Sequence, residues 1–126
     1  MAMKKLPKRL LVVEDDPDQC ACLRDRLELY GYDVACAADG EQAREMLRTD
    51  SFDGIVLDLN LPLLSGNDLL LEAGDRFPQT PIILMSASQS LLRKAKAQSS
   101  GQRAYMLKPY GVSQFKYAVQ SLFGSA

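Results

Sequence analysis

The sequence contains no histidine in its 126 residues. A phosphohistidine carrier, a histidine general base and most histidine-ligated metal sites are therefore excluded. Only three cysteines are present, and none are in the Cys-x-x-Cys spacing. This argues against a disulfide framework or a zinc site and indicates a protein of the reducing cytoplasm.

The sequence also has no marked excess of either charge and no long apolar run. Its 15 Lys and Arg against 16 Asp and Glu give a net charge of −1, which does not indicate binding to nucleic acid or to a membrane surface. No stretch approaches the ~20 apolar residues of a membrane span, and the basic N-terminus lacks the apolar run of a signal peptide. With 47% hydrophobic residues, we expect residues 1–126 to form a single globular domain.

Short apolar runs predict the strands. Four of them are continuous and not alternating, which is typical of strands buried on both faces in a parallel sheet covered by helices. A fifth segment is weaker, and its Asp33 and small residues favour an edge strand. The four runs are residues 10–13, 55–57, 82–85 and 104–107, and the weaker segment is residues 32–37.

Apolar residues between these runs recur at helical spacing. Asp16 before Pro17, and Asp39 with Gln42, predict helix N-caps, and Gly31 is placed to end a helix. Strands that alternate with helices predict right-handed crossovers and an open, doubly wound α/β sheet. The five helical stripes are Cys20, Leu23, Leu27 and Tyr30; Ala43, Met46 and Leu47; Leu69, Leu70, Ala73 and Phe77; Leu91, Leu92 and Ala95; and Val112, Phe115, Val119 and Leu122. We interpret the cysteines, Cys20, Cys22 and Cys36, as small buried or half-buried residues.

Polar residues follow each of the four central runs. In a parallel sheet the carboxyl ends of the strands share one edge, where ligands bind, so these side chains are expected to converge. The residues are Glu14, Asp15 and Asp16 after the first run, Asp58 after the second, Ser86 after the third and Lys108 after the fourth.

The chemistry of this group points to a cation and a phosphate. Two carboxylates about 4 Å apart repel by roughly 4 kcal/mol at an effective dielectric near 20, and one lysine does not offset three of them. Carboxylate oxygens favour Mg²⁺ as their ligand-bound metal. Phosphate oxygens commonly complete the coordination shell of this ion. Asp58 is the best candidate for a nucleophile that forms an acyl phosphate, with Asn60 and Pro62 in the loop behind it. We interpret Asp16 as a helix cap.

Together these motifs resemble the receiver domain of two-component response regulators, over about residues 9–123. The resemblance implies a five-stranded, flavodoxin-like parallel sheet of order 2-1-3-4-5 with helices on both faces, forming a single receiver domain with no output domain. The motifs are residues 11–16 (Leu-Val-Val-Glu-Asp-Asp), residues 58–62 (Asp-Leu-Asn-Leu-Pro), Ser65-Gly66, Ser86-Ala87 and Lys108-Pro109.

The resemblance also assigns roles. Asp58 would accept a phosphoryl group from a phosphohistidine on a sensor histidine kinase or a phosphotransfer protein. Asp15, Asp58 and the main-chain carbonyl of Asn60 would ligate Mg²⁺, while Glu14 would act through a water. Ser86 would be the switch hydroxyl and Lys108 its lysine partner, with a cis bond to Pro109. Tyr105 would be the aromatic that changes rotamer when the hydroxyl moves.

The resemblance implies signalling through protein partners and not enzyme activity. The readout would be a downstream effector protein or domain on the face of the fourth helix, fifth strand and fifth helix, and a homodimer through this face is also allowed. Direct contact with nucleic acid or membrane is not expected. Candidate contacts are Leu91, Arg93, Lys94, Lys96 and Tyr105, although the basic residues are first interpreted as a solvated helix face.

Three alternatives stay open at this point. The chain could be a receiver module of a larger transcription factor or hybrid histidine kinase. An aspartyl-phosphate phosphatase of the haloacid-dehalogenase type would need an aspartate where Asn60 stands. A flavodoxin-like cofactor binder would need a phosphate-cradling loop where the sequence has Glu14, Asp15 and Asp16.

Overall fold

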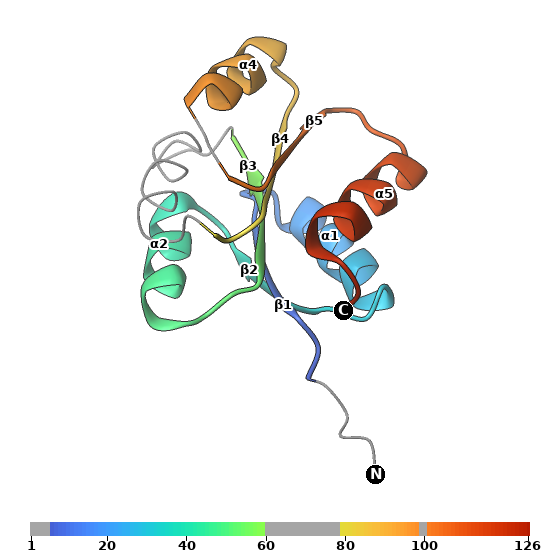
Figure 1. Cartoon of the computed structure of the whole chain (residues 1–126). Coiled ribbons are helices and arrows are strands. Elements are labelled where there is room, and N and C mark those ends of the chain that lie inside the picture. The colour runs from blue at the N-terminus through green and yellow to red at the C-terminus, as the bar shows by residue number, and fades with distance from the viewer. Residues whose placement is uncertain (1–5, 60–78, 99–100) are drawn as a thin grey trace.

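The computed structural model describes residues 6–59, 79–98 and 101–126. Within these residues, five strands form one parallel sheet of order β2-β1-β3-β4-β5, as expected (Figure 1). The strands are β1 (Arg9–Val13), β2 (Asp33–Ala37), β3 (Gly54–Asp58), β4 (Ile82–Ser86) and β5 (Arg103–Leu107). The helices are α1 (Pro17–Leu29), α2 (Gly40–Thr49), α4 (Gln89–Gln98) and α5 (Val112–Phe123). The predicted stripe of Leu69, Leu70, Ala73 and Phe77 lies outside the described residues.

The sheet separates two apolar layers. On one face, alternate strand residues such as Leu11 and Leu57 pack with the buried sides of α2 and α4. On the other face, residues such as Val12 and Val56 pack with α1 and α5. Figure 1 shows these two pairs of helices on opposite sides of the sheet. The central strands are buried on both faces, which explains why their sequences are continuously apolar.

The predicted helix ends are confirmed. The Asp16 carboxylate accepts the backbone N–H of Asp18 at 2.9 Å and thereby caps α1. Asp39 accepts the backbone N–H of Gln42 at 2.8 Å and caps α2. Gly31 has a φ of 100°, the left-handed conformation that favours glycine after a helix.

Three details differ from the expectations. The run at residues 104–107, expected to be buried on both faces, forms the edge strand β5, where Leu107 is 42% exposed. Val112, assigned to an apolar stripe, is 58% exposed because it is the first residue of α5 and extends past the packed part of the helix. Cys22 is exposed, since it lies on the solvent side of α1 between the buried Cys20 and Leu23. None of the described helices is long and apolar enough to cross a membrane.

Candidate functional site

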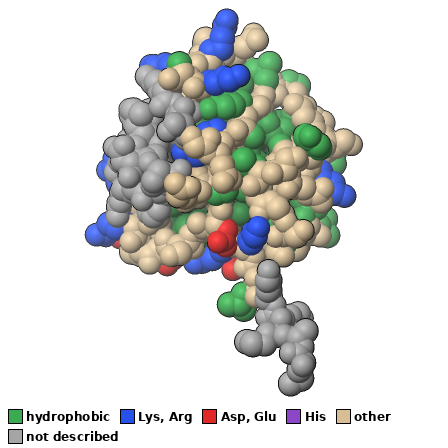
Figure 2. Space-filling view, in the orientation of Figure 1, with side chains coloured by type: hydrophobic (Ala, Val, Ile, Leu, Met, Phe, Trp, Pro, Cys, Tyr) green, Lys and Arg blue, Asp and Glu red, His purple; other side chains and the backbone are tan. Residues whose placement is uncertain are grey.

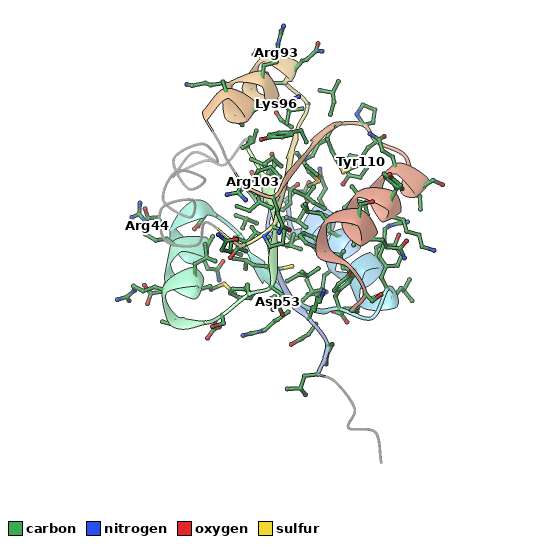
Figure 3. The ribbon with its side chains drawn as sticks, in the orientation of Figure 1. Arg44, Asp53, Arg93, Lys96, Arg103 and Tyr110 are labelled. Carbon is green, nitrogen blue, oxygen red and sulfur yellow. The ribbon has the colours of Figure 1, made fainter. Side chains whose placement is uncertain are left out.

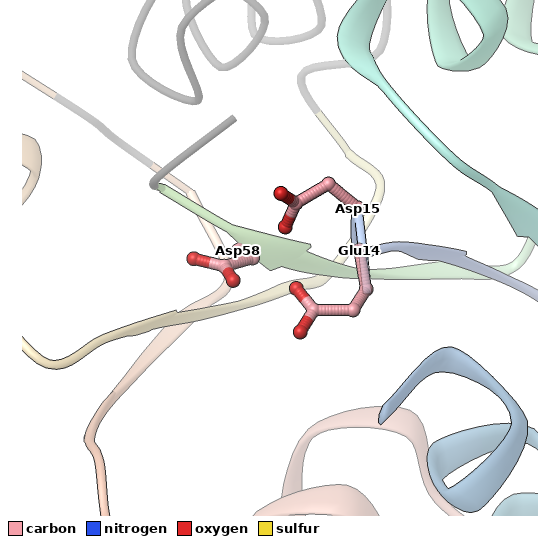
Figure 4. Close-up of side chains that lie close together, drawn as sticks. All are labelled: Glu14, Asp15 and Asp58. Carbon is pink, nitrogen blue, oxygen red and sulfur yellow. The ribbon is translucent and has the colours of Figure 1, made fainter. Parts of the chain in front are cut away.

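Three carboxylates meet at the carboxyl edge of the sheet. Glu14 and Asp15 directly follow β1, and Asp58 is the last residue of β3, the neighbouring strand. One carboxylate oxygen from each residue lies within 4.8 Å of the other two, and Figure 4 shows the three groups facing a common space. The convergence expected from the ends of adjacent parallel strands is therefore present.

Burial makes this cluster electrostatically unusual. Glu14 is 2% and Asp58 4% exposed, while Asp15 is exposed. The Lys108 ammonium, which follows β5, donates to Asp58 Oδ2 at 3.0 Å and lies 3.7 Å from Glu14 Oε1. Among the described residues, it is the only cation within ion-pair distance of these carboxylates. Within residues 6–59, 79–98 and 101–126, a single positive charge therefore lies close to three carboxyl groups.

Burial and the neighbouring charges together shift the pKa values of Glu14 and Lys108. Burial, together with the neighbouring Asp58, raises the pKa of Glu14 to about 8. Although burial opposes the charged ammonium of Lys108, Asp58 and Glu14 hold the pKa of this group above its usual value. Glu14 Oε2 is buried and has no hydrogen-bond partner among the described residues. An all-oxygen cluster with an unsatisfied buried oxygen is chemically suited to a hard divalent cation.

Ser86 lies beside this cluster at the end of β4. Its side chain is fully buried, and its hydroxyl oxygen accepts the backbone N–H of Ser88 at 2.9 Å. The backbone N–H of Lys108 donates to the Ser86 carbonyl at 2.8 Å, which fixes the two residues side by side. The Lys108–Pro109 peptide bond is cis, as expected.

The remaining predicted residues have different positions. Tyr105 is half-buried on β5, packs against the layer that contains α4, and has the Lys96 ammonium 6.0 Å from its ring centroid. Asn60 lies outside the described residues. Asp16 caps α1 and is not part of the carboxylate cluster, in agreement with its interpretation.

Sequence reasoning missed one contact with the site. The Gln19 side-chain oxygen accepts a hydrogen bond from the Lys108 ammonium at 3.4 Å. These residues are far apart in the chain, so no local pattern pairs them. One sequence feature could have indicated that Gln19 lies near the site. It belongs to the first turn of α1, the helix that begins just after the acidic residues at the end of β1.

Comparisons with known proteins agree with this geometry. Residues 10–120 match the family model of the response regulator receiver domain. The chain is 32% identical over 114 residues to the transcriptional regulatory protein PrrA of Mycobacterium tuberculosis, covering 90% of this chain and 49% of that protein. The chain thus spans about half the length of the curated relatives it matches.

Two solved structures share the fold. One is the response regulator TrrA of Thermotoga maritima in complex with Mg²⁺ and BeF, with a TM-score of 0.82, 27% identity and coverage of 91% of this chain and 98% of that one. The other is the receiver domain of the sensor histidine kinase PA1611 of Pseudomonas aeruginosa, described with a magnesium ion in its active-site cleft. It has a TM-score of 0.81 and 28% identity, and the match covers 95% of this chain and 100% of that one. The chain therefore belongs to the response regulator receiver domain family.

Proposed function

We propose that Asp58 accepts a phosphoryl group and that the chain thereby acts as a Mg²⁺-dependent switch in two-component signalling. The observation that carries this proposal is the position of Asp58. Its carboxylate is buried at the end of β3, receives a hydrogen bond from the Lys108 ammonium at 3.0 Å, and belongs to a cluster of three carboxylates. Because residues 1–126 contain no histidine, the phosphohistidine donor would lie outside these residues.

In the transfer, an Asp58 oxygen attacks phosphorus while the bond from phosphorus to the donor imidazole nitrogen breaks. The products are an aspartyl phosphate and the partner's free histidine. Lys108 then exchanges its contact with the carboxylate for a contact with a phosphoryl oxygen, where it offsets the developing charge. We assign metal binding to Asp15 and Asp58, with Glu14 acting through a water and Asn60 supplying its carbonyl. Bound Mg²⁺ would neutralise the carboxylates and the incoming phosphoryl oxygens.

Ser86 and Tyr105 are proposed to convert phosphorylation into a conformational change. The Ser86 hydroxyl oxygen accepts the Ser88 N–H, and a serine hydroxyl also carries one O–H donor, which would turn to a phosphoryl oxygen. The phosphoryl group adds about −1.5 to −2 charges, which favours the arrangement in which these donors turn toward it. Tyr105 would then change rotamer on β5 and alter the face read by a partner.

We further propose the setting in which this switch works. The phosphoryl donor is a sensor histidine kinase or a phosphotransfer protein, and the partner that reads the switch is a downstream effector protein or domain. Residues 1–126 would form one receiver unit in the cytoplasm, signalling by docking and not acting as an enzyme on a separate substrate. PrrA is named a transcriptional regulator, so a receiver module of a longer regulator is the main alternative to a receiver that acts alone.

Incubation with acetyl phosphate and Mg²⁺, followed by intact-mass measurement, tests the proposal. We expect one phosphate adduct in the unchanged protein, none in Asp58→Asn, and one in the matched control Asp33→Asn, whose side chain is exposed at the opposite end of the sheet. An adduct that persists in Asp58→Asn would refute the assignment. Steady hydrolysis of phosphate monoesters without an accumulating adduct would instead indicate the alternative function, an aspartyl-phosphate phosphatase.

A further inference from the structure

Two cysteine thiols meet between α1 and β2. Cys20 belongs to α1 and Cys36 to β2. The Cys36 thiol donates to the Cys20 carbonyl, with 3.6 Å between sulfur and oxygen, and a further side-chain hydrogen bond joins the two thiols. The two residues are 16 positions apart in the sequence, so the tertiary fold brings them together. Two thiols in contact are placed to form an intramolecular disulfide.

The third cysteine of the sequence has a different environment. Cys22 is two positions beyond Cys20 on α1 and is therefore displaced by about 200° around the helix. It is exposed and lines a hollow between α1 and α5, together with Tyr110, which Figure 3 labels. Cys22 is thus placed away from Cys36 and provides a matched control for the pair.

The two thiols differ in how readily an oxidant reaches them. Cys20 is only 6% exposed, whereas Cys36 is half-buried. Burial raises the pKa of the Cys20 thiol to about 12, the hydrogen bond with Cys36 adds to this rise, and Arg24 opposes it only in part. Figure 2 shows Lys and Arg side chains gathered over α4, which packs on the other face of the sheet from α1. Oxidation is therefore expected to begin at Cys36, and Cys20 reacts second.

A surface hollow gives a small oxidant access to the pair. Both cysteines line it, and so do Glu14 and Asp15 of the carboxylate cluster. Its volume is about 320 Å³. A water molecule takes about 30 Å³ in the liquid, so the hollow has room for hydrogen peroxide, which is only a little larger than water. The same hollow therefore connects the thiols to the solvent and to the acidic site.

Main-chain hydrogen bonds link the pair to the acidic segment between β1 and α1. The Cys20 N–H donates to the Asp16 carbonyl at 2.9 Å. On the other side, the Glu14 N–H donates at 3.1 Å to the carbonyl of Ala37, which follows Cys36. A disulfide brings its two sulfurs closer together than a thiol hydrogen bond does, so α1 and β2 would be drawn toward each other and this segment would shift. Because Mg²⁺ requires nearly ideal octahedral geometry, such a shift weakens its binding.

We propose that Cys20 and Cys36 form a reversible disulfide in the presence of a peroxide and that this bond weakens Mg²⁺ binding at the neighbouring carboxylates. The Cys36 sulfur attacks one peroxide oxygen and becomes a sulfenic acid, while the O–O bond breaks and the other oxygen leaves as water with the thiol proton. The Cys20 sulfur then attacks the Cys36 sulfur, and the S–O bond breaks as a second water leaves with the Cys20 proton. The thiols are oxidised, the peroxide is reduced, and a thiol reductant reverses the bond.

Such a disulfide suits a protein of a reducing compartment, where disulfides are usually transient and sense oxidants. Formation of the bond goes beyond the proposed function and does not depend on it. Its effect on Mg²⁺ rests on the proposed function, because it takes the carboxylate cluster as the metal site.

Hydrogen peroxide treatment of the full 126-residue chain tests the proposal in two steps. The Cys22→Ser variant is used, because Cys20 and Cys22 share the tryptic peptide of residues 10–24, while Cys36 lies in that of residues 27–44. Digestion without reductant is expected to give these two peptides linked, and dithiothreitol is expected to separate them. The control carries Cys36→Ser as well, and it should give no linked peptide.

Magnesium affinity is then measured by calorimetric titration before oxidation, after oxidation and after reduction. We expect the disulfide to weaken Mg²⁺ binding by about tenfold, as changes behind the ligands of a metal site commonly do. Reduction should restore the affinity. In the control, which contains the same methionines, peroxide should leave the affinity unchanged.

The outcomes separate the competing explanations. A linked peptide together with a reversible loss of Mg²⁺ affinity supports the proposal. If peroxide produces no linked peptide, the two cysteines only fill space in the packing and the proposal is overturned. A linked peptide with unchanged Mg²⁺ affinity overturns the regulatory effect. If the reduced protein binds no Mg²⁺ at all, the proposed function fails instead, and the linked peptide alone then decides whether the disulfide forms.

Discussion

Lowering the pH is expected to weaken Mg²⁺ binding, because the metal must displace the proton that Glu14 holds at neutral pH. The pKa of Glu14 is raised to about 8 by burial and by the neighbouring Asp58. Below that pH the metal-free carboxyl group is mostly protonated, whereas a bound divalent cation favours the ionised form. Between about pH 8.5 and about pH 6.5, linkage then predicts that the dissociation constant for Mg²⁺ rises about 25-fold. A carboxyl group with an ordinary pKa would produce almost no change over this range.

Calorimetric titration in two buffers of different ionisation enthalpy measures this proton directly. At about pH 7 we expect about 0.9 proton to be released for each Mg²⁺ bound. Glu14→Gln, which has the same shape without the ionisable group, should release almost none and should bind Mg²⁺ with little dependence on pH. Asp18→Asn is the matched control, because this exposed residue of α1 lies outside the carboxylate cluster. The reasoning would be refuted if the protein without substitutions binds Mg²⁺ equally well at both pH values and releases no proton.

Three further predictions concern stability, each measured by denaturant unfolding. Gly54→Ala would place a Cβ atom 2.5 Å from the Phe123 ring, and this overpacking should lower the free energy of unfolding by about 1–3 kcal/mol. Gly111→Ala is the control, because its Cβ atom meets nothing within 4 Å and the free energy of unfolding should stay nearly unchanged. Asp16→Ala removes the N-cap of α1 and should lower the free energy of unfolding by about 0.5–2 kcal/mol. An unchanged denaturant midpoint would contradict this. In metal-free protein the raised pKa of Glu14 means that the folded state binds the proton more tightly than the unfolded state, so stability should fall by a few kcal/mol as pH rises from about 5 to about 8. Glu14→Gln should not show that fall.

Much of the fold could be predicted from local pattern. The central strands are buried on both faces, so their apolar residues run without interruption, and their ends could be located to within a residue or two. The residues alone did not determine the order of the strands, which depends on contacts between distant segments. That order came from the resemblance to receiver domains and is confirmed by the observed pairing.

The site was predictable as a set of residues but not as an electrostatic environment. Glu14, Asp58 and Lys108 were identifiable because each lies at the end of an apolar run, at the same edge of the sheet. The raised pKa of Glu14 depends on its burial and on its distance from Asp58, which no local pattern encodes. The same applies to Gln19, whose contact with Lys108 joins two elements through the tertiary fold.

The central claim is that Asp58 carries the phosphoryl group. Its most direct test is to treat the phosphorylated protein with borohydride, which reduces an aspartyl phosphate to homoserine, and to locate the product by peptide mass spectrometry. We predict homoserine at position 58 after treatment with acetyl phosphate and Mg²⁺, and unmodified aspartate there when the phosphodonor is omitted. Homoserine at another aspartate with position 58 unchanged would contradict the account.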